Sequence, residues 1–133
     1  MNLLVCGGRD CSRHDVWNWL ERNAYLEIAH ATRCHSVTLE KLIHGGARGA
    51  DEGAADWGRS EGIKVISYPA NWRKHGKSAG PIRNQKMLDE GKPDIVMAFP
   101  GGKGTADMMR RAEAAGIPVI QAGSTPSYIT GVK

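Results

Sequence analysis

Residues Phe99–Thr105 read FPGGKGT, a composition suited to binding phosphate. An apolar run typical of a buried parallel strand precedes them, and strong helix formers follow. Their three glycines let the backbone approach a ligand closely, and the free N–H groups at the start of the helix would point at an anion. Thr105 would add a hydroxyl donor or cap the helix. A plain strand-to-helix turn needs fewer glycines, so the stretch favours an anion site.

Three more segments combine glycine with charged side chains at the expected start of a helix: Gly7–Asp10 (GGRD), Gly45–Asp51 (GGARGAD) and Gly80–Lys86 (GPIRNQK). Each would bring backbone N–H donors and an arginine, whose planar guanidinium suits phosphate oxygens. Because parallel strands end at one edge of a sheet, we expect all four segments to meet there. The predicted ligand-binding residues are Gly7, Gly8, Arg9, Asp10, Gly45, Gly46, Arg48, Asp51, Arg83, Asn84, Lys86, Pro100, Gly101, Gly102, Gly104 and Thr105.

Several of these side chains have two interpretations. Asp10 and Asp51 would accept ribose hydroxyls or hold the arginines in place. Arg48 and Asp51 would otherwise form a surface pair at i,i+3 spacing. Trp72, in a basic stretch, would stack on a base or anchor its loop on the core. The sequence leaves these alternatives open.

The elements that would position these residues alternate between strand and helix. The predicted strands are Leu3–Cys6, Thr38–His44, Lys64–Ser67, Ile95–Phe99 and Ile117–Ile120. The predicted helices are Ser12–Leu26, Ala50–Glu61, Pro81–Glu90 and Thr105–Ala115, with residues 27–36 left between helix and loop and Tyr68–Gly80 as a long polar loop. This alternation predicts an α/β fold, a Rossmann-like doubly wound, mostly parallel sheet of about five strands with flanking helices. We expect a single domain over 1–133, in which 122–133 is a flexible tail or docks on a partner.

Composition narrows the class of protein. We expect a cytoplasmic protein, because the sequence has no apolar run long enough to span a membrane and shows no signal peptide. The three cysteines lack metal-ligand spacing, so we expect free thiols, no metal site and no cofactor. The net charge is +4, and no acid lies between Glu61 and Asp89. That one-sided basic stretch is either a surface for an anionic partner or a solvated loop face.

Two common nucleotide motifs are missing. The glycines of Gly7–Asp10 do not complete G-x-G-x-x-G, and no G-x-x-x-x-G-K-[ST] occurs. Their absence argues against hydride transfer and ATP hydrolysis. The chain instead resembles the SLOG superfamily of Rossmann-like proteins, specifically its small YspA-like branch. The matching stretches are VCGGRD at 5–10, HGGARGAD at 44–51, PANW at 69–72, AGPIRNQKML at 79–88, AFPGGKGT at 98–105 and GIPV at 116–119.

The resemblance implies a Rossmann-like sheet with a pocket for a nucleotide or nucleotide-derived ligand, and a homo-oligomer, since relatives often pair through helices. Lonely Guy phosphoribohydrolases share PGGxGT, but their catalytic glutamate corresponds here to Met108, beside Asp107. Their catalytic arginine resembles Arg83. DNA-processing A proteins share a GxARGxD-like turn and an RN-containing helix, and they bind single-stranded DNA.

We therefore predict a protein that binds a nucleotide or nucleotide-derived small molecule in order to sense or sequester it. The alternative is an N-glycosidase acting on nucleoside phosphates or ADP-ribose-like compounds. In that case Asp107 and Arg83 are the candidate catalytic residues, with Asp51 or Asp10 as other carboxylates for an oxocarbenium-like centre. Single-stranded nucleic-acid binding is a third hypothesis, and we expect no membrane partner.

Overall fold

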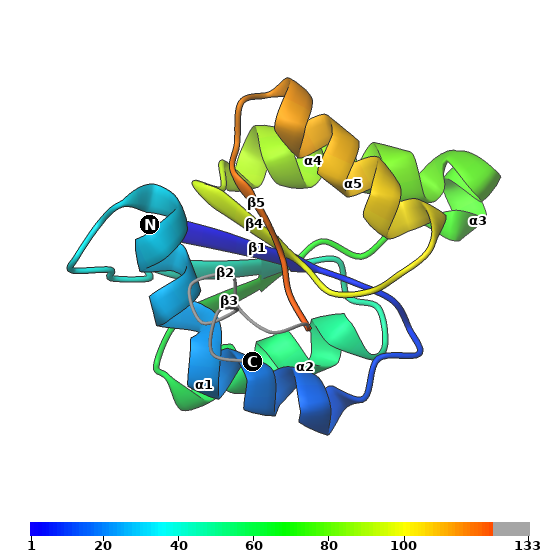
Figure 1. Cartoon of the computed structure of the whole chain (residues 1–133). Helices are drawn as coiled ribbons and strands as arrows, with labels where there is room; N and C mark the ends of the chain where they lie inside the picture. The colour runs from blue at the N-terminus through cyan, green and yellow to red at the C-terminus, as the bar shows by residue number, and fades with distance from the viewer. Residues whose placement is uncertain (124–133) are drawn as a thin grey trace.

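The computed structural model describes residues 1–123, and its centre is a five-stranded parallel sheet in the order β3-β2-β1-β4-β5 (Figure 1). The strands are β1 (Asn2–Cys6), β2 (Lys41–His44), β3 (Lys64–Ser67), β4 (Ile95–Ala98) and β5 (Val119–Gln121). The predicted α/β, Rossmann-like fold is confirmed.

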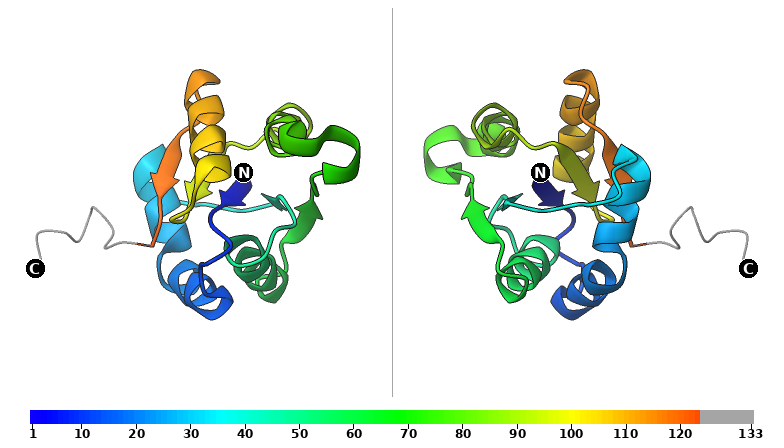
Figure 2. Two further views of the ribbon diagram at one scale, coloured as in Figure 1. Left: turned by 90° about the vertical axis from the view of Figure 1, so that its right-hand side faces the viewer. Right: turned by 90° about the vertical axis from the view of Figure 1, so that its left-hand side faces the viewer.

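Helices cover both faces of the sheet. They are α1 (Arg13–Thr32), α2 (Ala50–Ser60), α4 (Ala79–Gly91) and α5 (Lys103–Ala114), with a short α3 (Trp72–His75) and a 3₁₀ helix, η1 (Gly76–Ser78). Helices α1 and α2 lie on one face, and α4 and α5 lie on the other, as both side views show (Figure 2).

The alternation of side chains along β1 shows why both faces need a cover. Leu3 and Val5 point into the core beneath α1 and α2, where Trp57 is fully buried. Leu4 and Cys6 point into the core beneath α4 and α5, which also holds Met108. A strand buried on both faces reads as a continuous apolar run, and this explains why the sequence identifies it.

Helix α1 starts at a side-chain cap. Ser12 has extended backbone angles, and its Oγ accepts a hydrogen bond from the N–H of Asp15 at 3.2 Å. Replacing Ser12 by Ala removes this acceptor, so we expect the free energy of unfolding to fall by about 1 kcal/mol. Urea denaturation measures the change. The matched variant Ser12→Asp keeps an acceptor and is expected to stay near wild type; equal losses in both variants would contradict the capping role.

Helix α1 settles the segment that the sequence left open. It continues to Thr32 because Ile28 is fully buried against the core. It ends at Arg33, whose φ of 56° is left-handed and whose N–H donates to the Ala29 carbonyl.

The predicted loop over residues 68–80 is wrong from Trp72 onward, where helical structure begins. Asn71 caps α3 by accepting from the N–H of Lys74 at 3.0 Å, and η1 then leads directly into α4. Helix α4 begins at Ala79, two residues before the predicted start at Pro81, and Gly80 is buried in its first turn.

Three other boundaries differ from the prediction by two or three residues. Strand β2 starts at Lys41, after the expected Thr38, because pairing with β1 starts at Asn2 opposite Lys41. Helix α5 starts at Lys103, before the expected Thr105. Strand β5 starts at Val119, after Pro118, which has no N–H to donate to a ladder.

The sheet edge extends into the segment that we expected to be a tail. Ala122 is buried and its N–H donates to the Ala98 carbonyl at 2.7 Å. The rest of the predicted tail, 124–133, lies outside the described residues. Among residues 1–123, no helix combines the length and the apolar character that crossing a membrane requires.

Candidate functional site

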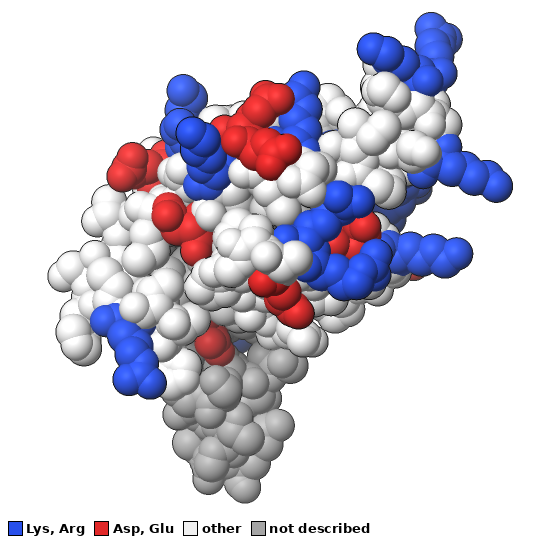
Figure 3. All heavy atoms as spheres, turned by 90° about the horizontal axis from the view of Figure 1, so that it is seen from above, with Lys and Arg blue, Asp and Glu red and all other residues white. Residues whose placement is uncertain are grey.

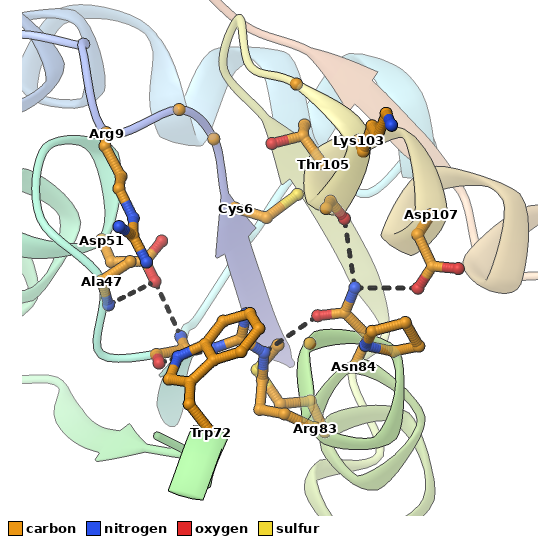
Figure 4. Close-up of a pocket in the computed structure, with 18 of the residues that line it drawn as sticks. Cys6, Arg9, Ala47, Asp51, Trp72, Arg83, Asn84, Lys103, Thr105 and Asp107 are labelled. Atoms are coloured by element: carbon orange, nitrogen blue, oxygen red, sulfur yellow. Dashed lines mark hydrogen bonds between the residues drawn. The ribbon is translucent and has the colours of Figure 1, made fainter. Parts of the chain in front are cut away.

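The strand order creates a crevice at the carboxyl ends of β1 and β4. The chain leaves β1 for α1 on one face and leaves β4 for α5 on the other, and ligands of such sheets bind where the order reverses in this way. A pocket of about 430 Å³ lies there, formed by the turns after β1, β2 and β4 and by the start of α4 (Figure 4).

Most of the predicted residues line this pocket. They are Gly7, Gly8, Arg9, Gly45, Asp51, Arg83, Asn84, Gly102, Gly104, Thr105 and Asp107. Ala47, Gly80, Pro81 and Lys103, which belong to the four segments but were not predicted individually, also line the pocket. Cys6, Lys77 and Met87 line it without having been predicted. Trp72 also lines it, so the tryptophan of the basic stretch faces the pocket.

Six predicted residues lie elsewhere. Asp10, Pro100 and Gly101 line a neighbouring cavity of about 840 Å³, on the α1 side of the turns. Lys86 lines a separate hollow of about 340 Å³ beside β3. Arg48 is exposed and does not pair with Asp51, which within residues 1–123 accepts hydrogen bonds from backbone N–H groups. Gly46 supplies a positive φ of 74° next to Ser67 and Pro69.

The turns after β1 and β2 are held together by close backbone packing. A Cβ on Gly8 would lie 2.8 Å from the Pro100 carbonyl oxygen, and one on Gly49 would lie 2.6 Å from the Gly8 carbonyl oxygen. Gly49 also has a φ of 77°. These glycines are therefore needed for the fold at this edge, whatever the ligand.

The turn after β2 has little capacity left for an anion. The N–H groups of Gly45 and Ala47 donate to Asp51 Oδ2 at 3.0 and 3.1 Å. The N–H of Gly46 donates to His44 Nδ1 at 3.0 Å. The N–H of Gly49 donates to Glu52 Oε1 at 3.1 Å. Our expectation that this segment brings free N–H donors is therefore wrong for these groups.

In the turn after β4, two glycines are not closely packed, unlike Gly8 and Gly49. A Cβ on Gly102 or on Gly104 would meet no atom within 4 Å, and neither residue has a left-handed φ. Both residues are exposed and line the pocket. Lack of space therefore does not require glycine at either position, although a side chain would intrude on the pocket.

The start of α5 also lacks a cap. Its N-cap residue is Gly102, and no side chain of residues 1–123 accepts a hydrogen bond from its first turn. The N-terminus of α1, by contrast, is capped by Ser12. The open first turn of α5 leaves donors and the positive end of a helix dipole at the pocket wall.

Arg83 extends from α4 across the pocket (Figure 4). Its Nη1 donates to the Gly45 carbonyl at 2.6 Å and its Nε donates to Asn84 Oδ1 at 3.0 Å, while no residue in 1–123 accepts from Nη2. Burial lowers the pKa of Arg83, and the nearby charge of Asp51 opposes this shift. The guanidinium is thus fixed by two contacts and keeps both N–H groups of Nη2 for a ligand.

Asp107 is a paired carboxylate. It accepts hydrogen bonds from Asn84 Nδ2 at 3.0 Å, Arg111 Nε at 2.8 Å and Arg110 Nη2 at 3.3 Å. Partial burial pushes its pKa upward, but the hydrogen bonds from Arg111 and Asn84 and the charges of both arginines outweigh burial and lower the pKa overall. Asp107 is therefore ionised, and its acceptors are largely occupied.

The carboxyl group of Asp51, unlike that of Asp107, has a raised pKa. It is only 5% exposed, and burial is the largest influence on its pKa, which rises to about 6 despite the N–H of Ala47 and the charge of Arg83. Cys6 lies on the floor of the same pocket, and burial, with the charge of Asp51, raises the pKa of its thiol to about 12. The pocket lining therefore includes a thiol and a carboxyl group whose pKa is raised to about 6.

Positive charge surrounds the pocket. Figure 3 shows the Lys and Arg side chains gathered toward the end of the molecule that carries α3. Exposed cations on the rim of the pocket are Arg9, Lys77 and Lys103, and Arg73 and Lys74 follow Trp72 in α3. Within residues 1–123, no group of three or more His, Cys, Asp or Glu side chains is arranged to hold a metal.

Comparisons with known proteins agree with this architecture. The family model described as "YspA, cpYpsA-related SLOG family" matches residues 1–75, more than half of the chain. The gene 61 protein of Mycobacterium phage D29 is 47% identical over 92 residues, which cover 64% of this chain and 73% of the phage protein. The X-ray structure of the structural genomics target TM1055 has a TM-score of 0.60 at 17% identity, covering 98% of this chain and 79% of that one, so it shares the fold. With its sheet, its glycine turns and this match, the chain belongs to the YspA, cpYpsA-related SLOG family.

Proposed function

We propose that the pocket binds the phosphate of a nucleotide or nucleotide-derived small molecule, which the protein senses or sequesters. The observation that carries this proposal is the pair Gly102 and Gly104. A Cβ would meet no neighbour at either position, and both leave open space in front of an uncapped helix start. Gly104 lies inside the first helical turn, where glycine lowers stability relative to alanine, so close approach of a ligand gives this residue a reason to be glycine.

The remaining lining residues suit the rest of a nucleotide. Arg83 Nη2 and the exposed Lys103 supply charged donors for phosphate oxygens. Trp72 offers an indole that is about half exposed at the rim, where a base would stack. The volume of about 430 Å³ falls within the usual range for small-molecule pockets, roughly 300–1,000 Å³.

Binding is favoured over hydrolysis by the state of Asp107. A general acid must hold a proton, but the pKa of Asp107 is lowered, and a nucleophile needs a free oxygen, but Asn84, Arg111 and Arg110 all donate to this carboxylate. Its hydrogen bonds instead fix the start of α5 against α4, because Asn84 also donates to the Gly104 carbonyl at 3.1 Å.

Mass spectrometry of a nucleotide panel tests the proposal. Purified protein is incubated with nucleoside monophosphates, NAD, ADP-ribose and cyclic dinucleotides, and the free pool is sampled before and after the protein is denatured by heat. We expect at least one compound to be depleted and to return intact. Release of free base with a ribose phosphate would instead show an N-glycosidase, and no depletion of any compound would contradict nucleotide binding.

A further inference from the structure

Asp51 is a buried carboxylate with only half of its acceptor capacity in use. Oδ2 accepts from the N–H groups of Gly45 and Ala47, as the two dashed lines in Figure 4 show, whereas Oδ1 has no hydrogen-bond partner in residues 1–123. Across those residues, the only fully buried side-chain polar atom without a partner is His44 Nε2, so Asp51 Oδ1 is not fully buried. Because Asp51 lines the pocket, its Oδ1 is reached from the pocket.

The surroundings of Oδ1 decide which ligand group would meet it. Arg83 interacts electrostatically with Asp51 and with Arg9. A ligand ammonium would be repelled by these guanidinium groups, and a ligand anion would be repelled by Asp51 itself. The suitable partner is a neutral hydrogen-bond donor, and the strongest common one in a phosphate ester is a sugar hydroxyl.

The position of Asp51 agrees with a sugar. In Figure 4, Asp51 and Ala47 form one side of the pocket, Lys103 and Thr105 form the other, and Cys6 lies between them. A ribose 5′-phosphate unit with its phosphate at the start of α5 would carry the sugar over Cys6 and direct its hydroxyls away from the phosphate.

We propose that Asp51 Oδ1 accepts a hydrogen bond from the 2′ or 3′ hydroxyl of the ligand, so that the site selects ribose phosphates over deoxyribose phosphates. This inference rests on the proposed phosphate binding and adds the class of sugar. It assigns to Asp51 a specificity role that the geometry does not give to Asp107, whose carboxylate is engaged by three side chains.

The test compares AMP with analogues that change one hydroxyl, by calorimetry or NMR titration of the whole chain at about pH 7.5, where Asp51 is ionised. The 2′-deoxy and 3′-deoxy analogues remove the hydroxyl, and the 2′-fluoro and 3′-fluoro analogues keep an acceptor without a donor. For either the 2′ or the 3′ position, we expect both the deoxy and the fluoro analogue to bind about tenfold more weakly than AMP. A loss of this size corresponds to one charge-assisted hydrogen bond.

Asp51→Asn attributes the preference to this side chain. Its amide oxygen can still accept from Gly45 and Ala47, so the turn is retained, but the group facing the pocket becomes a donor. We expect AMP and the fluoro analogue to bind this variant within about threefold of each other. The exposed Asp89→Asn removes the same charge far from the pocket and should keep the wild-type preference.

Each other outcome is decisive. A wild type that binds AMP, does not bind adenosine and ignores the hydroxyl changes would overturn the role of Asp51 and leave phosphate binding intact. The same would hold if Asp51→Asn kept the full preference. Failure of AMP and of every other 5′-phosphate to bind would overturn the proposed function, and this inference with it.

Discussion

Replacing Gly104 by Ala is expected to weaken phosphate-dependent binding by about 30-fold while leaving the protein as stable as wild type, or more stable by up to about 1 kcal/mol. Gly104 lies in the first turn of α5 with no neighbour within 4 Å of an added Cβ and an ordinary φ. In a helix the Cβ tilts toward the N-terminus, so the new methyl group enters the space that an anion needs. Helix propensity meanwhile favours alanine.

The measurement pairs a binding titration with urea denaturation of the same preparation. Gly62→Ala is the matched control, because its Cβ also meets nothing within 4 Å, but its φ is +74° and it lies at the end of α2, away from the pocket. We expect this control to lose about 1 kcal/mol of stability and to keep its affinity. If Gly104→Ala lost stability without losing affinity, the glycine would be needed for the fold and the argument for a phosphate turn would fail.

The order of strands and helices could be predicted from the sequence because the central strands are buried on both faces. Leu3–Cys6 has no polar residue and is followed directly by two glycines, so strand and turn are both visible. Helix α3 could not be predicted with the same signals. It is four residues long and depends on the Asn71 side chain and on the seating of Trp72 against Gly80 in α4, which is a contact between elements.

The site was predictable as a location and less so as a set of contacts. The sequence places Arg83 and Lys86 one helical turn apart, yet only Arg83 lines the pocket, because its guanidinium bonds to the Gly45 carbonyl. The glycines after β2 also resemble an anion-binding turn in the sequence. The structure shows that most N–H groups of this turn already donate to side chains of the protein. The sequence holds one signal that the N-terminus of α2 uses its own acceptor. Glu52 lies three residues after Gly49, a spacing typical of a capping box, and accepts from the Gly49 N–H.

Asp51→Asn is expected to change how stability depends on pH. The pKa of Asp51 is raised to about 6 from an ordinary value of 3.8, chiefly by burial. The folded state therefore holds this proton more tightly than the unfolded state, and the contribution of Asp51 to stability falls as pH rises between those two values. Two pKa units correspond to about 3 kcal/mol, which is the upper limit of the effect above about pH 6.

Asparagine keeps the acceptor for Gly45 and Ala47 and cannot ionise. The stability of Asp51→Asn minus that of wild type should therefore rise by about 2–3 kcal/mol from about pH 4 to about pH 7.5. Urea denaturation across this range measures it. Asp107 and Asp56, whose pKa values are lowered, give the opposite slope, but they are present in both proteins and cancel in the difference.

Asp89→Asn again serves as the control, because Asp89 is exposed and does not line the pocket. A difference for Asp51→Asn that stays constant with pH would show that this carboxyl titrates normally. If the difference rises as expected, the wild-type protein keeps a group that destabilises it at neutral pH in a place where an amide would fit. A carboxylate that opposes folding yet faces the pocket with one oxygen unused is best explained by what it binds.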